Sequence, residues 1–85
     1  MGPVSHRNPV RAVHQSRYKT MLRRLRSARL EAKMTQVEVA AALGRTQAFV
    51  SKCELGERRM DPLDLADFAR VYERPVAYFL RDTQE

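Results

Sequence analysis

The sequence holds little cysteine and no long apolar run, and these absences limit what the protein can be. One cysteine among 85 residues cannot form an intrachain disulfide, so the sequence does not point to an oxidising compartment. No apolar stretch approaches the roughly 20 residues that span a bilayer, and the N-terminus has no apolar segment of the signal-peptide kind. We therefore expect one small cytoplasmic domain without a membrane segment.

The usual residue sets of catalysis and cofactor binding are also missing. The chain has no Ser-His-Asp or Cys-His set, no spacing of metal ligands and no glycine-rich phosphate loop. Its two histidines, His6 and His14, are too far apart to share one helical face, and we interpret Cys53 as a small core residue. We expect no enzyme activity, metal, cofactor or small-molecule ligand.

Acidic residues are absent from the N-terminal third of the chain. Residues 1–30 contain eight basic residues and no acidic one, whereas the whole chain has a net charge of +6. Such asymmetry indicates a polyanionic partner, either nucleic acid or an anionic membrane surface. The alternative is a solvated basic segment that only keeps the protein in solution, and charge alone does not separate these interpretations.

Residues 1–16 show no apolar period and contain Pro3 and Pro9, which is typical of a disordered arm. Such a basic arm either lies along a DNA groove or makes no contact, and both interpretations stay open.

We place the folded domain at residues 17–81 and a polar tail at residues 82–85. The first helix is expected over about residues 17–32, where apolar side chains recur at helical spacing: Tyr18, Met21, Leu22, Leu25, Ala28 and Ala32.

Capping signals predict the next two helices. Thr35 and Glu38 have the pattern of a capping box, which starts a second helix that ends at Gly44. Thr46 is the expected N-cap of a third helix, and Gly56 closes it. The few residues between these helices require a tight turn.

The C-terminal part contains signals for two more helices. Asp61 and Pro62 predict the start of a fourth helix, because a capping acid is followed by proline at the first helical position. A short fifth helix is expected over about residues 75–80. Since no strand pattern or internal repeat is present, we expect an all-α fold, a compact bundle of about five short helices.

Residues 36–55, QVEVAAALGRTQAFVSKCEL, combine these signals in the layout of a DNA-binding helix-turn-helix. Two helices that cross steeply need a small side chain where they touch, which Ala40 supplies, and the tight turn needs Gly44. Val50 and Cys53 are the expected buried positions of the following helix. The opposite face of that helix is then available to enter a major groove.

This stretch resembles the lambda-repressor-like helix-turn-helix family, also called the xenobiotic-response-element type. The shared sequence motif is T-Q-x-x-x-A-x-x-L-G followed by T-Q-x-x-V-S-K-x-E-x-G-E-R. The resemblance extends from about Leu22 to Leu80. It implies a five-helix bundle that usually acts as a dimer to repress or activate transcription. It also implies a cytoplasmic location in association with the nucleoid.

The resemblance implies roles for individual side chains at the DNA. Gln47 would read a base, because a glutamine amide both donates to and accepts from adenine, whereas Ala48 would touch a thymine methyl or nothing. Gln36 would brace the recognition helix and bond a phosphate. The implied base contacts are Gln47, Ala48, Ser51 and Lys52, with Ser51 and Lys52 open to backbone contact as well. The implied phosphate contacts are Gln36, Arg45, Thr46, Arg58 and Arg59.

Two further features complete the expected architecture. The resemblance implies a buried ion pair between Arg29 and Glu54, which would orient the recognition helix against the first helix. The aromatic residues Tyr72, Tyr78 and Phe79 are expected to be half core, and their exposed remainder is the candidate dimer surface. The alternative is a closed monomer core that buries them.

The expected function is a transcription regulator, more specifically a repressor, that binds a palindromic operator in double-stranded DNA as a homodimer through the major groove. The alternative is an antitoxin-type protein that binds a toxin partner and autoregulates its operon. A third interpretation, a basic module for membranes or RNA, leaves the arrangement of Ala40, Gly44 and Gln47 unexplained.

Overall fold

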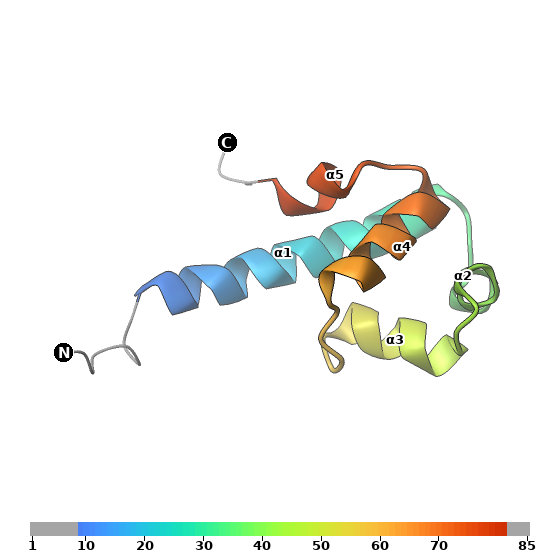
Figure 1. Ribbon diagram of the computed structural model, residues 1–85, viewed down its shortest axis with the longest axis horizontal. Helices are drawn as coiled ribbons and strands as arrows, with labels where there is room; N and C mark the ends of the chain where they lie inside the picture. Colours follow the sequence, from blue (N-terminus) through green and yellow to red (C-terminus); the bar gives the residue numbers. More distant parts are fainter. Residues whose placement is uncertain (1–8, 82–85) are drawn as a thin grey trace.

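Five α-helices follow one another in residues 9–81, the part of the chain that the computed structural model describes, with side chains described from residue 15 (Figure 1). Every regular element in this part is helical, which confirms the all-α bundle. None of these helices is long and apolar enough to cross a membrane. The helices are α1 (Pro9–Glu31), α2 (Gln36–Leu43), α3 (Gln47–Leu55), α4 (Pro62–Tyr72) and α5 (Val76–Leu80).

Helix α1 is longer than its apolar stripe predicts. It begins at Pro9 rather than near Arg17, so residues 9–16 are helical instead of disordered, and the N-terminal turns project beyond the other helices (Figure 1). Proline fits the first helical position, and no glycine or further proline interrupts the following residues. The missing apolar period therefore did not mean that the segment is without a helix. Residues 1–8 and 82–85 lie outside the described residues, so the limits of arm and tail stay a prediction.

Side-chain caps start α2 and α4 as the sequence predicts. Thr35 accepts a hydrogen bond from the Glu38 amide at 3.1 Å, and the Thr35 amide donates to the Glu38 carboxylate at 2.9 Å. Asp61 and Asp64 exchange the same two bonds at α4, where Pro62 occupies the first turn. Both capping boxes satisfy amide groups that have no partner inside the helix.

Glycines in the left-handed conformation end α2 and α3. Gly44 has φ of 71° and Gly56 has φ of 81°, a region in which an L side chain is strained. Thr46 then caps α3 by accepting a hydrogen bond from the Phe49 amide at 3.1 Å. These predicted features turn the chain tightly between α2 and α3 and set the course of α3.

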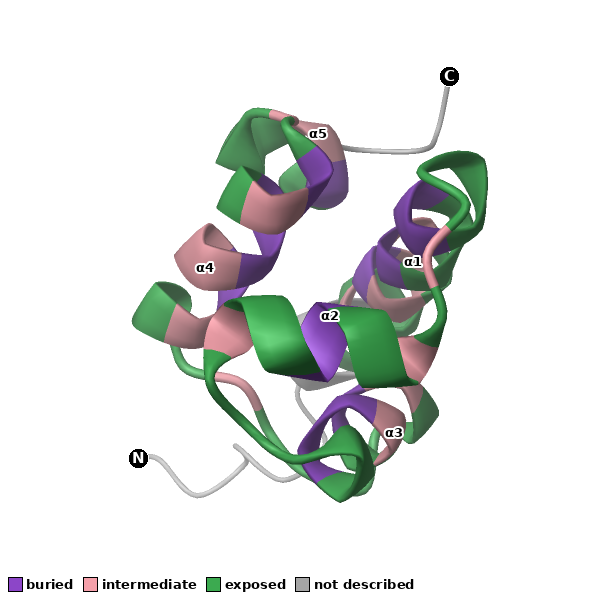
Figure 2. Cartoon of the chain, turned by 90° about the vertical axis from the view of Figure 1, so that its right-hand side faces the viewer, coloured by how far each residue is buried: buried purple, intermediate pink, exposed green. Residues whose placement is uncertain are grey.

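The core lies between α1, α4 and the helix pair α2–α3, and α5 packs against α1. The buried faces of the helices point inward (Figure 2). Ala40 is buried at the crossing of α2, whereas the two following alanines are exposed. The buried apolar residues are Met21, Leu25, Ala28, Val39, Ala40, Phe49, Val50, Cys53, Leu65, Phe68, Ala69, Tyr72 and Phe79.

The C-terminal aromatic residues belong mostly to this core, which corrects the candidate dimer surface. Tyr72 is 6% exposed and Phe79 is 1% exposed, so neither can meet a second chain. Burial also raises the pKa of the Tyr72 hydroxyl. Tyr78 is half-buried, and the guanidinium groups of Arg74 and Arg81 lie 4.7 and 5.2 Å from its ring centre. Tyr78 and Phe79 belong to the short α5, which packs against α1.

Candidate nucleic-acid interface

Helix α3 has one face in the core and one face on the surface. Phe49, Val50 and Cys53 are 8%, 0% and 0% exposed. On the other face Gln47, Ala48 and Lys52 are exposed and Ser51 is half-buried. The four residues expected to contact bases thus share one face of a helix whose opposite face anchors it. This is the arrangement that a recognition helix needs.

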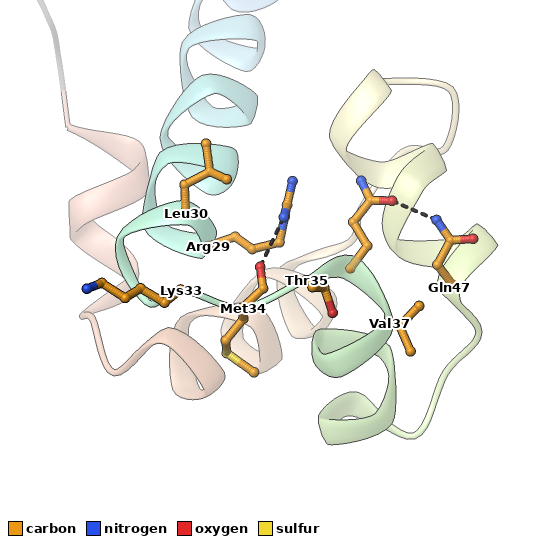
Figure 3. A pocket seen from close by; sticks show the side chains of 8 residues that line it. Arg29, Leu30, Lys33, Met34, Thr35, Val37 and Gln47 are labelled. Carbon is orange, nitrogen blue, oxygen red and sulfur yellow. Dashed lines mark hydrogen bonds between the residues drawn. The ribbon is translucent and has the colours of Figure 1, made fainter.

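Gln47 makes a hydrogen bond to the preceding helix. Its amide nitrogen donates to the Gln36 side-chain oxygen at 2.7 Å, which joins the start of α3 to the start of α2 (Figure 3). The Gln36 nitrogen in turn donates to the Glu54 carboxylate at 3.0 Å. Gln36 therefore braces Gln47, and Glu54 holds Gln36.

Arg29 and Glu54 lie against each other at the end of this series of hydrogen bonds. The Arg29 Nε and a terminal nitrogen donate to the two Glu54 oxygens at 2.6 and 3.1 Å, and another Arg29 nitrogen donates to the Met34 carbonyl at 3.1 Å. The side chains are 10% and 5% exposed, and the hydrogen bond to Glu54 raises the pKa of Arg29. The pair that the resemblance implied thus joins α1, the turn after it and α3.

Three basic side chains gather at a hollow beside the N-terminus of α3. Arg45, Lys52 and Arg58 line it together with Thr46 and Phe49. The guanidinium carbons of Arg45 and Arg58 lie 3.7 and 5.0 Å from the centre of the Phe49 ring, so one aromatic ring positions both cations. Cations at a helix N-terminus suit a phosphate group, because the backbone amides there add their attraction.

Two of the expected phosphate contacts have other neighbours. Arg45 also lies 3.8 Å from a carboxylate oxygen of Asp64, which offsets part of its charge. Arg59 stands apart from the hollow, with its guanidinium 4.3 Å from the centre of the Tyr18 ring on α1. The Tyr18 hydroxyl accepts a hydrogen bond from the Met60 amide at 3.1 Å, so this tyrosine fixes the loop after α3 against α1.

Leu55 is a surface residue that the sequence interpretation missed. It is 67% exposed, and it follows Gln47 and Ser51 at intervals of four residues on the same face of α3. The four-residue spacing was the available signal. The buried positions of α3 are filled by Phe49, Val50 and Cys53, so Leu55 is left on the surface.

Cys53 belongs to the core, as its isolation in the sequence indicated. It is 0% exposed, and burial raises the pKa of its thiol to about 11. A neutral thiol packed in a core contributes as a small apolar side chain.

Comparison with known proteins agrees with this geometry. A family model described as a helix-turn-helix domain matches residues 21–78. A solved structure of an XRE-family like protein from Pseudomonas syringae pv. tomato str. DC3000 is similar at 42% sequence identity, with a TM-score of 0.81, and the match covers 86% of this chain and 89% of that chain. The comparison with curated proteins found no match. The chain therefore belongs to the XRE, or lambda-repressor-like, family of helix-turn-helix DNA-binding transcription regulators.

Proposed function

We propose that the protein is a sequence-specific repressor that binds a palindromic operator as a homodimer, with α3 of each copy in the major groove. The observation that carries this proposal is the exposed polar face of α3 beside a hollow lined by three cations. The α3 face has the hydrogen-bonding groups that read base edges, and the hollow has the charge that holds phosphates. Both open on the same side of the molecule because Lys52 belongs to both.

The base contacts follow from the chemistry of the α3 face. Gln47 offers an amide to adenine, and Lys52 offers a donor to guanine or to a phosphate. Ser51 sits between them as a short donor and acceptor. The apolar side chains Ala48 and Leu55 supply contact with thymine methyl groups.

The phosphate contacts flank this face at both ends. Arg45, Arg58 and the amide groups that follow Thr46 hold the backbone at the N-terminus of α3. Gln36 keeps one N–H group for a phosphate after its bond to Glu54. Arg59, whose guanidinium lies over the Tyr18 ring, contacts a phosphate of the DNA backbone.

Dimer formation needs a surface away from α3, and α5 offers one. With Tyr72 and Phe79 in the core, the large exposed apolar side chains of α5 are Val76, at 37%, and Leu80, at 45%. Helices α5 and α3 lie on opposite sides of α1 in Figure 1. A second copy seated against α5 therefore leaves α3 uncovered. Two-fold symmetry then predicts half-sites separated by about 10 bp, one helical turn.

Selection of binding sites from random duplexes tests the proposal. At about 0.15 M salt, non-specific attraction to phosphates is screened enough for sequence preference to decide which duplexes are retained. The expected result is a palindromic consensus that binds two chains per duplex, measured by sedimentation. Recovery of no consensus would overturn the proposal. In that case a protein that co-purifies with the chain would favour the antitoxin-type alternative.

A further inference from the structure

A continuous path of hydrogen bonds leads from a buried charge to the exposed start of α3. It passes from Arg29 to Glu54, from Glu54 to Gln36 and from Gln36 to Gln47, with donor–acceptor distances of 2.6, 3.0 and 2.7 Å. Glu54 is 5% exposed at its side chain, whereas Gln47 is exposed. The path thus connects a nearly buried group with a group that faces DNA in the proposed function.

The direction of every bond in this path is set by Glu54. A carboxylate paired with a guanidinium offers only acceptors, so the Gln36 atom beside it is the amide nitrogen. The Gln36 oxygen then faces Gln47, and an oxygen accepts but does not donate. The Gln47 atom that meets it is therefore the amide nitrogen, and the Gln47 oxygen points away from α2 (Figure 3).

One N–H group and the oxygen of the Gln47 amide remain available. Adenine presents a donor at N6 and an acceptor at N7 in the major groove, and this pair matches one oxygen and one N–H group. Guanine presents two acceptors, O6 and N7, which require two donors. With one N–H group bound to Gln36, the Gln47 oxygen would face a guanine acceptor and repel it.

We propose that Glu54 is a positioning residue that makes Gln47 select adenine over guanine, by fixing through Gln36 which end of the Gln47 amide faces the DNA. The inference rests on the proposed function, in which Gln47 reads a base. The buried ion pair with Arg29 then has two roles. It orients α3, and it defines the hydrogen-bonding pattern that α3 presents.

Substitutions at Gln36 test the proposal without opening the core, because Gln36 is half-exposed and the cap of α2 is made by Thr35 and Glu38. Gln36→Lys places a donor against both Glu54 and Gln47, which turns the Gln47 oxygen inward and leaves two N–H donors for the DNA. Gln36→Met removes the hydrogen bonds at similar size. Val37→Lys is the matched control, since it adds the same charge at the next, exposed position outside the path.

The measurement uses two operator duplexes that differ by A·T or G·C at the position whose preference Gln47→Ala abolishes. The readout is the ratio of the two dissociation constants on one protein preparation, so an unfolded fraction cancels. We expect wild type and Val37→Lys to prefer adenine by about tenfold or more. Gln36→Met is expected to reduce this ratio towards one, and Gln36→Lys to favour guanine. Glu54→Gln, whose amide offers either end to Gln36, is expected to reduce the ratio without reversing it.

The inference fails while the proposed function stands if wild type prefers guanine at the position that Gln47 reads, or if the adenine preference is unchanged in Gln36→Lys and Gln36→Met. If Gln47→Ala alters no position of a recovered consensus, Gln47 reads no base and the inference fails while the operator stands. If no consensus exists, the proposed function fails first and the inference fails with it.

Discussion

Arg29 of α1 and Glu54 of α3 face each other through two hydrogen bonds of 2.6 and 3.1 Å, with both side chains nearly removed from water. Two parallel bonds between planar groups allow little rotation, so they define the angle between α1 and α3. Burial of both charges is costly, and pairing offsets much of that cost. The pair is therefore best understood as a device that sets orientation.

Breaking this pair on one side is expected to be more damaging than removing it whole. Glu54→Leu leaves the Arg29 charge buried and should lower the free energy of unfolding by about 3–5 kcal/mol. The double variant Arg29→Met with Glu54→Leu should recover much of that loss, because no uncompensated charge remains. Urea denaturation of the two single variants and the double variant measures the difference. A double variant as unstable as the sum of the singles would contradict this account.

The two glycine caps are expected to differ in their tolerance of alanine. Gly44→Ala should cost about 1–2 kcal/mol, the penalty of a left-handed backbone for an L residue, because an added Cβ has no atom within 4 Å. Gly56→Ala should cost more, since its Cβ would lie 3.1 Å from the Leu22 Cδ1 atom. Thermal denaturation of both variants tests the order. A Gly44 variant less stable than the Gly56 variant would show that the contact with Leu22 is relieved at no cost.

The Cys53 thiol is expected to be unreactive in the native protein. Its pKa of about 11 means that little thiolate forms at pH 8, and the side chain is 0% exposed. Because the folded pKa lies above the usual value of 9.0, the associated stability is fully present below pH 9 and is lost as pH rises towards 11. Labelling with iodoacetamide, with and without urea, measures the reactivity of the thiol in the native and the unfolded protein. The prediction fails if native protein is labelled as fast as unfolded protein.

Arg58→Ala should weaken binding to every DNA sequence by a similar factor. Loss of one phosphate contact should reduce the slope of log affinity against log salt concentration by about one unit. Arg70→Ala is the matched control, because Arg70 is an exposed arginine paired with Asp67 in the last turn of α4, and this end of α4 lies away from α3 (Figure 1). Titrations at several salt concentrations give both slopes. An unchanged slope for Arg58→Ala would show that Arg58 is a solvated side chain that contacts no phosphate.

Local signals predicted the helix-turn-helix because each of them acts over a few residues. Thr35 with Glu38 and Asp61 with Asp64 form caps from their own turn, and the caps at Gly44 and Gly56 require only a backbone conformation. The buried face of α3 likewise follows from helical spacing. Such features depend little on the rest of the fold, so the sequence alone indicates them.

Features that depend on distant parts of the chain were harder to predict. Tyr72 and Phe79 are buried because other helices cover them, and helical spacing alone does not tell how completely a side chain is covered. The bond between Gln36 and Glu54 joins residues 18 positions apart and requires the crossing of α2 and α3. Helix α1 extends to Pro9, although no apolar stripe in residues 9–16 predicts a helix there. Tertiary packing decides the first two of these features.

The central claim, that α3 reads bases, is tested most directly by comparing Gln47→Ala with wild type on the selected operator and on an unrelated duplex of equal length at one salt concentration. The account predicts a loss of about 1–3 kcal/mol per half-site on the operator, a relaxed preference at one base pair and unchanged affinity for the unrelated duplex. An equal loss on both duplexes would contradict it, because Gln47 would then contact the backbone.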